Sequence, residues 1–210
     1  MRDRRLRLVL TGLLTAAAVA GCTTGEIGQA VPTPSSTPQT SGGTSSPAPS
    51  ARVSVPPRPA ELNLAGVDPC ALITDPTLAA LKLNRKRVQQ AGDSQYRGMA
   101  QCTIDSTRSP FDSYALIAVT NEGVEAWLTG KRNVQAQLSS VAGFPAVTYW
   151  LSGANGRNAA DCSTSVDVAG GQQLMVESYN TGDRIYTLEQ LCQRAERAAG
   201  MAVETLKTLR

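Results

Sequence analysis

Four cysteines in the C-terminal part of the chain place the strongest constraint on its fold. They are Cys70, Cys102, Cys162 and Cys192. An even number of cysteines in an exported chain is typical of a disulfide framework, and four cysteines allow three pairings. We expect Cys70 to bond Cys102 and Cys162 to bond Cys192, because each bond then joins a helix start to a strand nearby in the sequence and the two loops do not interlock.

The start of the chain predicts the export that such disulfides need. Basic residues before position 8 precede an apolar stretch at residues 8–20, which is typical of a secretory signal peptide. This stretch is shorter than the roughly 20 residues of a membrane-spanning helix, so residues 1–21 are expected to be removed. The pair Arg4-Arg5 leaves general secretion and twin-arginine export both open.

A cysteine follows this segment in the pattern Val19-Ala20-Gly21-Cys22. The pattern resembles the bacterial lipobox, in which small residues fit the lipoprotein signal peptidase and the cysteine thiol receives a diacylglycerol group. The sequence therefore predicts lipid attachment at Cys22 and a location on the extracytoplasmic face of the cell membrane. The alternative is an ordinary secretory signal followed by an unrelated cysteine.

The next segment, residues 22–60, is rich in Ser, Thr, Pro and Gly and poor in large apolar side chains. Such a segment buries too little surface to offset the conformational entropy lost on folding. We expect a disordered tether between the lipidated Cys22 and one globular extracytoplasmic domain at residues 61–210. An O-glycosylated stalk has the same composition and is the alternative.

The charge balance argues against a nucleic-acid partner. The whole chain has 20 Lys and Arg against 17 Asp and Glu. Four arginines and Asp3 would leave with the signal peptide, so the mature chain would carry no net charge and would not concentrate polyanions through a bulk field. The basic cluster Arg85-Lys86-Arg87 is interpreted as a solvated turn after a helix.

Turn and capping signals divide the domain into helices and strands. Asp68 and Asp75 each precede a proline, a pattern in which the aspartate caps a helix and the proline takes its first position. Two short helices are therefore expected before a polar stretch at residues 84–98. A further short helix carrying Trp127 is expected at residues 123–128. Strands are predicted from apolar patterns at residues 101–105, 114–119 and 145–151.

A β-hairpin is predicted at residues 161–179, around Gly170-Gly171. A three-residue loop, residues 169–171, would pair Val166 with Leu174, whereas a two-residue Gly-Gly loop would place Leu174 on the polar face. We therefore favour the three-residue loop. The alternating residues Ser163, Ser165 and Asp167 are expected on a solvated face.

The clearest helix is predicted at residues 188–209. Thr187 and Gln190 form a capping-box pattern at its start. Apolar and small residues recur at helical spacing, namely Leu188, Leu191, Cys192, Ala195, Ala199, Ala202, Leu206 and Leu209. Because an alanine-rich stripe lets a helix lie close to a sheet, this helix is expected flat across the strands. The predicted fold is α/β of the α+β type, with a mainly antiparallel sheet packed by short N-terminal helices and a long C-terminal helix, and with two disulfides.

The residue types limit the available chemistry. The chain has no histidine, which removes the most common general base and transition-metal ligand. No nucleophile motif or phosphate-binding loop motif is present, so no catalytic, cofactor-binding or metal-binding residue is assigned and no cofactor is expected. Asp161, Asp167 and Glu177 flank the predicted hairpin and leave carboxylate chemistry open, although acids that alternate along a strand usually face solvent.

Several aromatic residues are candidates for a ligand cleft, because aromatic side chains favour apolar and sugar contacts. They are Trp127, Phe144, Tyr149, Trp150 and Tyr179. In a domain with so few aromatic residues, packing in the core is the favoured interpretation.

The domain contains a characteristic order of short motifs. They are Asp68-Pro69-Cys70, Gln101-Cys102-Thr103, Gly143-Phe144-Pro145-Ala146-Val147, Asp161-Cys162 followed by Val166-Asp167-Val168, and Leu191-Cys192 in the final helix. This order resembles an actinobacterial lipoprotein family of unknown function, over residues 64–209. The resemblance implies a cell-envelope location, helices on a mainly antiparallel sheet and no known substrate, and some relatives are suspected accessory proteins of envelope-stress signalling. Ile104 stands where the family pattern leads us to expect an aromatic residue.

These patterns together predict a membrane-anchored, non-catalytic binding or accessory module, because a long tether lets a domain find a partner at a distance. The expected partner is an envelope protein or a cell-wall ligand, in addition to the membrane reached through Cys22. A carboxylate-based envelope hydrolase is one alternative. A structural cell-wall spacer is the other.

Overall fold

The described part of the chain forms one antiparallel sheet of seven strands in the order β1-β2-β3-β7-β6-β5-β4. The structure, a computed structural model, describes residues 54–92, 95–182 and 185–209. The expected signal peptide, the lipid site Cys22 and most of the expected tether lie outside these residues. In chain order the elements are η1 (Pro69–Leu72), α1 (Asp75–Ala80), β1 (Arg85–Gln90), β2 (Ala100–Asp105), β3 (Ser113–Val119), η2 (Val124–Thr129), β4 (Val134–Val141), β5 (Phe144–Leu151), η3 (Gly156–Asn158), β6 (Asp161–Ala169), β7 (Gln172–Tyr179) and α2 (Leu188–Thr208).

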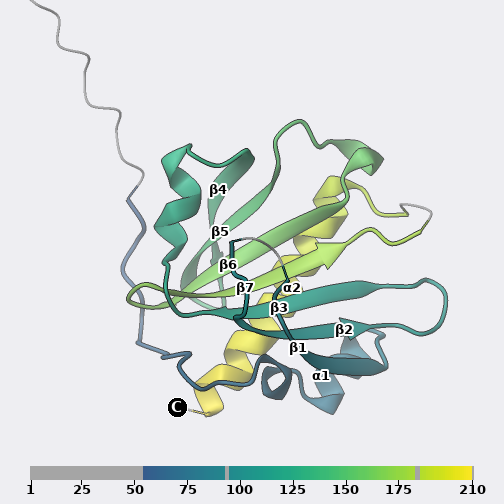
Figure 1. The fold of residues 1–210 in the computed structure, drawn as a ribbon, viewed down its shortest axis with the longest axis horizontal. Helices are drawn as coiled ribbons and strands as arrows, with labels where there is room; N and C mark the ends of the chain where they lie inside the picture. The colour runs from purple at the N-terminus through teal and green to yellow at the C-terminus, as the bar shows by residue number, and fades with distance from the viewer. Residues whose placement is uncertain (1–53, 93–94, 183–184, 210) are drawn as a thin grey trace, which may run out of the picture. The chain divides into compact units, whose positions relative to one another are not determined.

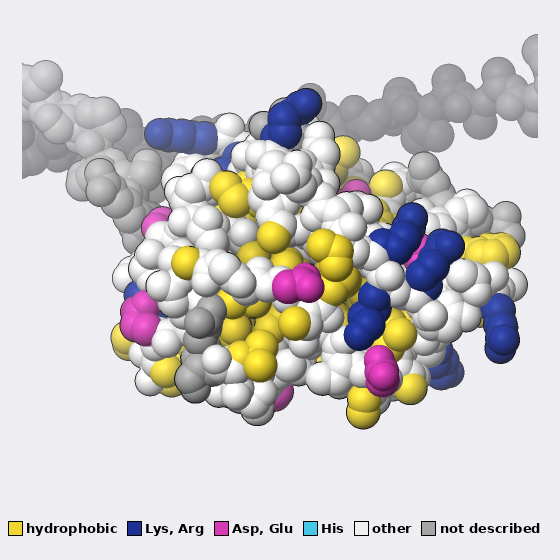
Figure 2. Space-filling view, turned by 60° about the horizontal axis from the view of Figure 1, so that its bottom comes forward, with side chains coloured by type: hydrophobic (Ala, Val, Ile, Leu, Met, Phe, Trp, Pro, Cys, Tyr) yellow, Lys and Arg dark blue, Asp and Glu magenta, His cyan; other side chains and the backbone are white. Residues whose placement is uncertain are grey.

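Different elements cover the two faces of the sheet. The long helix α2 runs across one face, and η1 packs into the same core (Figure 1). The opposite face is covered in part by η2 and by the segment around Tyr96. Figure 2 shows a side of the molecule on which hydrophobic side chains are exposed at the centre and several basic side chains gather to the right. The predicted fold class is confirmed.

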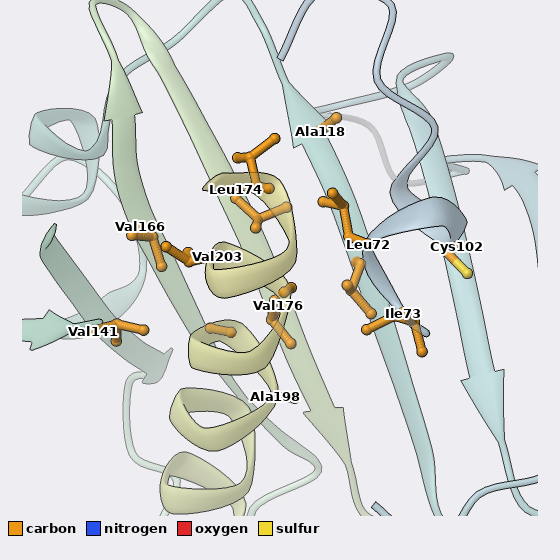
Figure 3. Close-up of a cluster of buried hydrophobic side chains, with 14 of the residues drawn as sticks. Leu72, Ile73, Cys102, Ala118, Val141, Val166, Leu174, Val176, Ala198 and Val203 are labelled. Atoms are coloured by element: carbon orange, nitrogen blue, oxygen red, sulfur yellow. The ribbon is translucent and has the colours of Figure 1, made fainter. Parts of the chain in front are cut away.

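The main core lies between α2 and the sheet. Leu174 and Val176 of β7 and Val166 of β6 point toward α2, which presents small side chains such as Ala198 at this contact (Figure 3). Small residues allow the helix axis to approach the strands closely, so the apolar side chains of the sheet fill the space beside the helix. Each buried Val or Leu side chain stabilises the fold by about 1.5–3 kcal/mol. The expectation of a flat-lying, alanine-rich helix is confirmed.

The two predicted disulfides are both present. Cys70 bonds Cys102 and so ties η1 to β2, with a Cα–Cα distance of 4.9 Å. Cys162 bonds Cys192 and ties β6 to α2, with a Cα–Cα distance of 5.0 Å. Both bonds therefore join the helical layer to the sheet rather than one strand to another.

A side-chain cap is present at the start of η1, of α1 and of α2. The Thr187 hydroxyl accepts a hydrogen bond from the Gln190 amide, and the Gln190 side chain accepts from the Thr187 amide, which confirms the predicted capping box. Asp68 caps η1 as expected. The helix α1 begins one residue earlier than predicted, because Thr74 and not Asp75 is its cap, with its hydroxyl accepting from the Thr77 amide.

The hairpin of β6 and β7 has the predicted register but a different turn. Val166 pairs with Leu174 as expected, while Ala169 pairs with Gln172, so only Gly170-Gly171 forms the turn. The register shifts between Asp167 and Ala169, so β6 has a β-bulge there. The bulge accommodates one extra residue in the strand, and the loop is one residue shorter than expected. The favoured three-residue loop is therefore wrong, although the pairing that it was chosen to explain is correct.

Two other expectations about exposure and local structure are wrong. Ser163, Ser165 and Asp167 are buried, because β6 lies inside the sheet and its second face is covered. The Arg85-Lys86-Arg87 run is not a turn but the start of the edge strand β1, which pairs with β2. Its pairing with β2, rather than an apolar pattern of its own, explains why it forms a strand. Exposed basic residues on an edge strand also discourage pairing with other chains.

Each disulfide is expected to contribute substantially to stability. Replacing Cys162 and Cys192 together by Ala should lower the free energy of unfolding by about 4 kcal/mol, because the bond closes a loop with a sequence separation of 30 residues. The Cys70→Ala/Cys102→Ala variant is the matched comparison, since its separation of 32 residues predicts nearly the same loss. Urea unfolding of both variants measures the effect, and losses below about 1 kcal/mol in both would contradict it.

Candidate functional site

An aromatic cluster covers the sheet face opposite α2. The rings of Trp127 from η2 and Tyr149 from β5 are stacked, with centroids 3.6 Å apart. The guanidinium of Arg132 lies 4.0 Å from the Trp127 ring centroid, and Tyr96 meets Trp127 edge-on at 6.3 Å. Trp127 therefore makes ring contacts with three neighbours, and η2 is fixed on the sheet through it.

A buried glutamine connects this cluster to the sheet. The Gln173 Oε1 atom on β7 accepts a hydrogen bond of 2.8 Å from the Trp127 indole. Its Nε2 atom donates to the Tyr96 hydroxyl and to the carbonyl oxygens of Glu122 and Gly123. A fully buried amide is tolerated because its oxygen and nitrogen both have partners. Gln173 thus holds η2 and the Tyr96 segment at one place on β7.

An ion pair between Arg132 and Glu122 lies beside the aromatic cluster. Arg132 donates to both carboxylate oxygens of Glu122, at 2.7 and 2.6 Å, and the Tyr96 hydroxyl donates to the same carboxylate at 2.7 Å. Burial opposes ionisation of Glu122, but the hydrogen bonds from Arg132 and Tyr96 outweigh it and lower the pKa of this carboxyl. The carboxylate is therefore stable as an anion and organises the groups around it.

A cleft opens beside this cluster, over the ends of β5, β6 and β7, and has a volume of about 290 Å³. Aromatic and apolar side chains form much of its wall, and two acids lie among them. The lining residues are Gln95, Tyr96, Trp127, Val134, Tyr149, Trp150, Leu151, Asp161, Ser163, Met175 and Glu177. Both tryptophans of the chain therefore line the same cleft.

The two acids of the cleft interact directly. Strand pairing places Glu177 opposite Ser163, one diagonal step from Asp161, and this brings the Asp161 and Glu177 side chains within hydrogen-bonding reach of each other. The Tyr179 hydroxyl donates a hydrogen bond of 2.6 Å to Glu177. Two carboxyl groups in such contact share a proton more readily than both ionise.

Burial changes the titration of these groups. Loss of solvent raises the pKa of Asp161, and the hydrogen bond with Glu177 offsets only part of that rise. Burial, followed by the nearby Glu177 carboxylate, raises the pKa of Tyr179, which stays a neutral donor. Ionisation of Asp161 in the cleft therefore has a cost in folding free energy. Such costs are concentrated at functional sites.

The chemistry of the cleft suits a cation or an amine better than an anion. Carboxyl oxygens accept hydrogen bonds from ammonium groups, and aromatic walls add cation–π and apolar contacts. No group of three or more Asp, Glu and Cys side chains that could hold a metal ion occurs in the described ranges.

The structure separates the residues that the sequence grouped together. Asp161 and Glu177 lie in the cleft, but Asp167 is at the far end of β6, where Arg58 donates to both of its carboxylate oxygens at 2.8 Å. Burial raises the pKa of Asp167 by more than Arg58 lowers it. Arg58 thus links residues N-terminal to position 61 to the sheet.

The aromatic candidates also have separate roles. Trp127, Tyr149 and Trp150 line the cleft. Trp127 and Tyr149 are also buried in the core on this face, and Phe144 is buried in the core beneath α2, as core packing predicted. Tyr179 contacts the cleft through Glu177. Sequence reasoning missed three residues that build the site, namely Tyr96, Arg132 and Gln173. No local pattern marks them, because their partners lie on other elements.

The fold and the cleft define a class of protein, a disulfide-bonded α+β domain with an aromatic cleft that contains two carboxyl groups. The chain belongs to a protein family of unknown function, DUF3558, whose sequence model matches residues 17–205. Searches of curated proteins and of solved structures found no match. In the described ranges, no helix has the length and apolar character needed to cross a membrane.

The raised pKa of Asp161 predicts a stabilising substitution. An acid with a raised pKa favours the folded state below its unfolded pKa, and this contribution is lost as the pH rises through the folded pKa. Asp161→Asn should therefore unfold at a higher temperature than the wild type at pH 7, and the difference should shrink as the pH falls below about 4. Thermal unfolding between pH 3.5 and 7.5 measures it.

Asp105→Asn is the matched control with the opposite sign. A hydrogen bond from Arg85, together with the charge of Arg87, lowers the pKa of Asp105. Its ionised form therefore stabilises the fold above the unfolded pKa, and this contribution is lost as the pH falls through the lowered pKa. Asp105→Asn should unfold at a lower temperature than the wild type at pH 7. Equal behaviour of the two variants would show that the environments of Asp161 and Asp105 do not differ as described.

Proposed function

We propose that this chain is a lipid-anchored, non-catalytic binding module on the extracytoplasmic face of the cell membrane. The basic and apolar start of the chain and the Val19-Ala20-Gly21-Cys22 pattern support the anchor. The resemblance to actinobacterial lipoproteins and the Ser/Thr/Pro-rich segment support a domain that is held at a distance from the membrane. Two disulfides are in keeping with an oxidising compartment.

The observation that best supports binding is the composition of the cleft. Trp127, Tyr149 and Trp150 border a space of about 290 Å³ that also contains the carboxyl groups of Asp161 and Glu177. Concave, mainly apolar sites with a few convergent polar groups are where proteins bind small ligands or projecting side chains. A passive spacer would need no such cleft. We therefore assign ligand binding to the cleft, with an amine or another cationic group as the part that enters it.

A carboxylate-based hydrolase is the second candidate, because Asp161 and Glu177 do lie together. Glycosidase pairs are separated by at least about 5 Å so that the sugar fits between them. The Asp161 and Glu177 side chains instead lie within hydrogen-bonding reach of each other, which resembles a proton-sharing dyad more than a glycosidase pair. This contact favours the binding function over glycoside hydrolysis.

The anchor is tested at Cys22. Metabolic labelling with a fatty acid should label the wild-type chain, and the Cys22→Ala variant should carry no label, because the thiol is the attachment point. The membrane fraction should contain the wild-type chain in the same experiment. Equal labelling of both chains would refute lipidation at this cysteine.

The binding role is tested by cross-linking from the rim of the cleft. Leu151 lines the cleft and its side chain is 57% exposed, so a photo-crosslinking residue fits there without disturbing the core. Irradiation of living cells should yield a discrete product from position 151. That product should be lost when Asp161→Asn and Glu177→Gln are added, because the carboxyl groups supply the ionic contact.

Val88 is the matched control position. Its side chain is 68% exposed on the edge strand β1, away from the cleft. The same products from positions 88 and 151 would contradict a specific role for the cleft, and diffuse capture of cell-wall material at both would support the spacer. A partner recovered cleaved from the wild type but intact from the Asp161→Asn variant would support the hydrolase.

A further inference from the structure

A second cavity lies on the α2 side of the sheet. It is bordered by α2, the turn between β2 and β3, and the segment that joins α1 to β1, and its volume is about 590 Å³. It shares no lining residue with the aromatic cleft. Any ligand of this cavity is therefore independent of the function proposed for the cleft.

Positive charge is concentrated on the wall of this cavity. Lys82, Arg108, Arg194 and Arg197 line it, against the single carboxylate of Asp112. Arg194 pairs with Asp112 at 3.1 Å, but the other three cations make no ion pair with any residue of the described ranges. The wall thus has a surplus of three positive charges in a chain that is otherwise nearly balanced. Like charges around one cavity repel each other, and an anion between them would remove that repulsion.

Arg194 is held rigidly at this wall. Its guanidinium lies 3.9 Å from the ring centroid of Tyr186 and 5.0 Å from that of Tyr114, and its Nε atom donates to the Ser178 hydroxyl at 3.3 Å. Asp112 in turn accepts a hydrogen bond of 2.8 Å from Tyr186. A guanidinium fixed in this way loses little conformational entropy when it binds a ligand.

One end of this guanidinium has unused donors. The Nη2 atom of Arg194 is buried and has no hydrogen-bond acceptor, since its contact with Asp112 is an ion pair without hydrogen-bond geometry. Buried donors without acceptors are costly and uncommon in folded proteins. Because Nη2 is buried, a ligand in the cavity would meet the positive charge of Arg194 rather than a hydrogen bond from this atom.

We propose that this cavity binds a small phosphomonoester. The exposed guanidinium groups of Arg108 and Arg197 can donate charge-assisted hydrogen bonds to the oxygens of a phosphate group, and Arg194 supplies further charge. A phosphomonoester carries about −1.5 to −2 charges near neutral pH, which fits a surplus of three positive charges better than the single charge of a phosphodiester does. A cavity of about 590 Å³ is within the size range of small-molecule sites. The rings of Tyr114 and Tyr186 offer apolar contacts to the organic part of the ligand.

Calorimetric titration of the full-length protein tests the proposal with three probes. They are inorganic phosphate, glycerol 3-phosphate as the phosphomonoester, and glycerophosphoglycerol as the deacylated headgroup of an anionic lipid. Glycerol 3-phosphate should bind more tightly than the other two. The Arg108→Gln/Arg197→Gln variant should bind it at least about tenfold more weakly, since two charge-assisted contacts are lost. These two side chains are exposed, so the variant should fold where a substitution of Arg194 would disturb packing.

The matched control is Lys131→Gln/Arg157→Gln, which removes the same charge from exposed positions outside both cavities. It should bind glycerol 3-phosphate as the wild type does. Equal weakening in the two variants would mean that only the overall charge matters and would overturn the site. Tighter binding of glycerophosphoglycerol would overturn the assignment to a monoester in favour of a lipid headgroup. Absence of binding by all three probes would overturn the proposal entirely.

Discussion

The structure depends on the central strands β6 and β7 being buried on both faces. On one face, residues such as Val166 and Val176 pack against α2 and provide the apolar contacts that stabilise the domain. On the other face the same strands present Ser163, Gln173 and other polar groups beneath a cover. Because buried polar groups must find partners, this second face dictates which loops and helices can lie over it.

Gln173 shows how one partner requirement organises a site. Its side chain has hydrogen-bond partners on η2, on the Tyr96 segment and in the backbone that leads into η2. Trp127 is therefore placed against Tyr149, and the uncovered ends of the strands become the aromatic cleft. Asp161 and Glu177 lie at these ends, where incomplete solvation raises the pKa of Asp161. Apolar packing against α2 stabilises the fold on one face of the sheet, and the aromatic cleft with its two acids lies on the other face.

Charge is distributed by the tertiary structure in a way that the balanced composition hides. Arg194 and Arg197 lie three positions apart on α2 and face a turn that brings Arg108 to the same cavity. Elsewhere, Arg85 and Arg87 both form ion pairs with Asp105 on the neighbouring strand. The net charge of the chain does not distinguish these two situations, which differ because Arg108 and Arg197 form no ion pair within the described residues while Arg85 and Arg87 do.

Local signals in the sequence determined much of the fold, because their physics involves residues close together in the chain. The capping box at Thr187 and the pairing of Val166 with Leu174 could each be predicted in this way. The two disulfides could be predicted from the order of the four cysteines along the chain. Only the tertiary structure decided the strand β1, the coverage of the polar face of β6 and the meeting of Asp161 and Glu177 with Trp127. These features depend on contacts between segments that are far apart in the sequence. No periodicity or spacing in the sequence indicates such contacts, because the partners come together only when the sheet assembles.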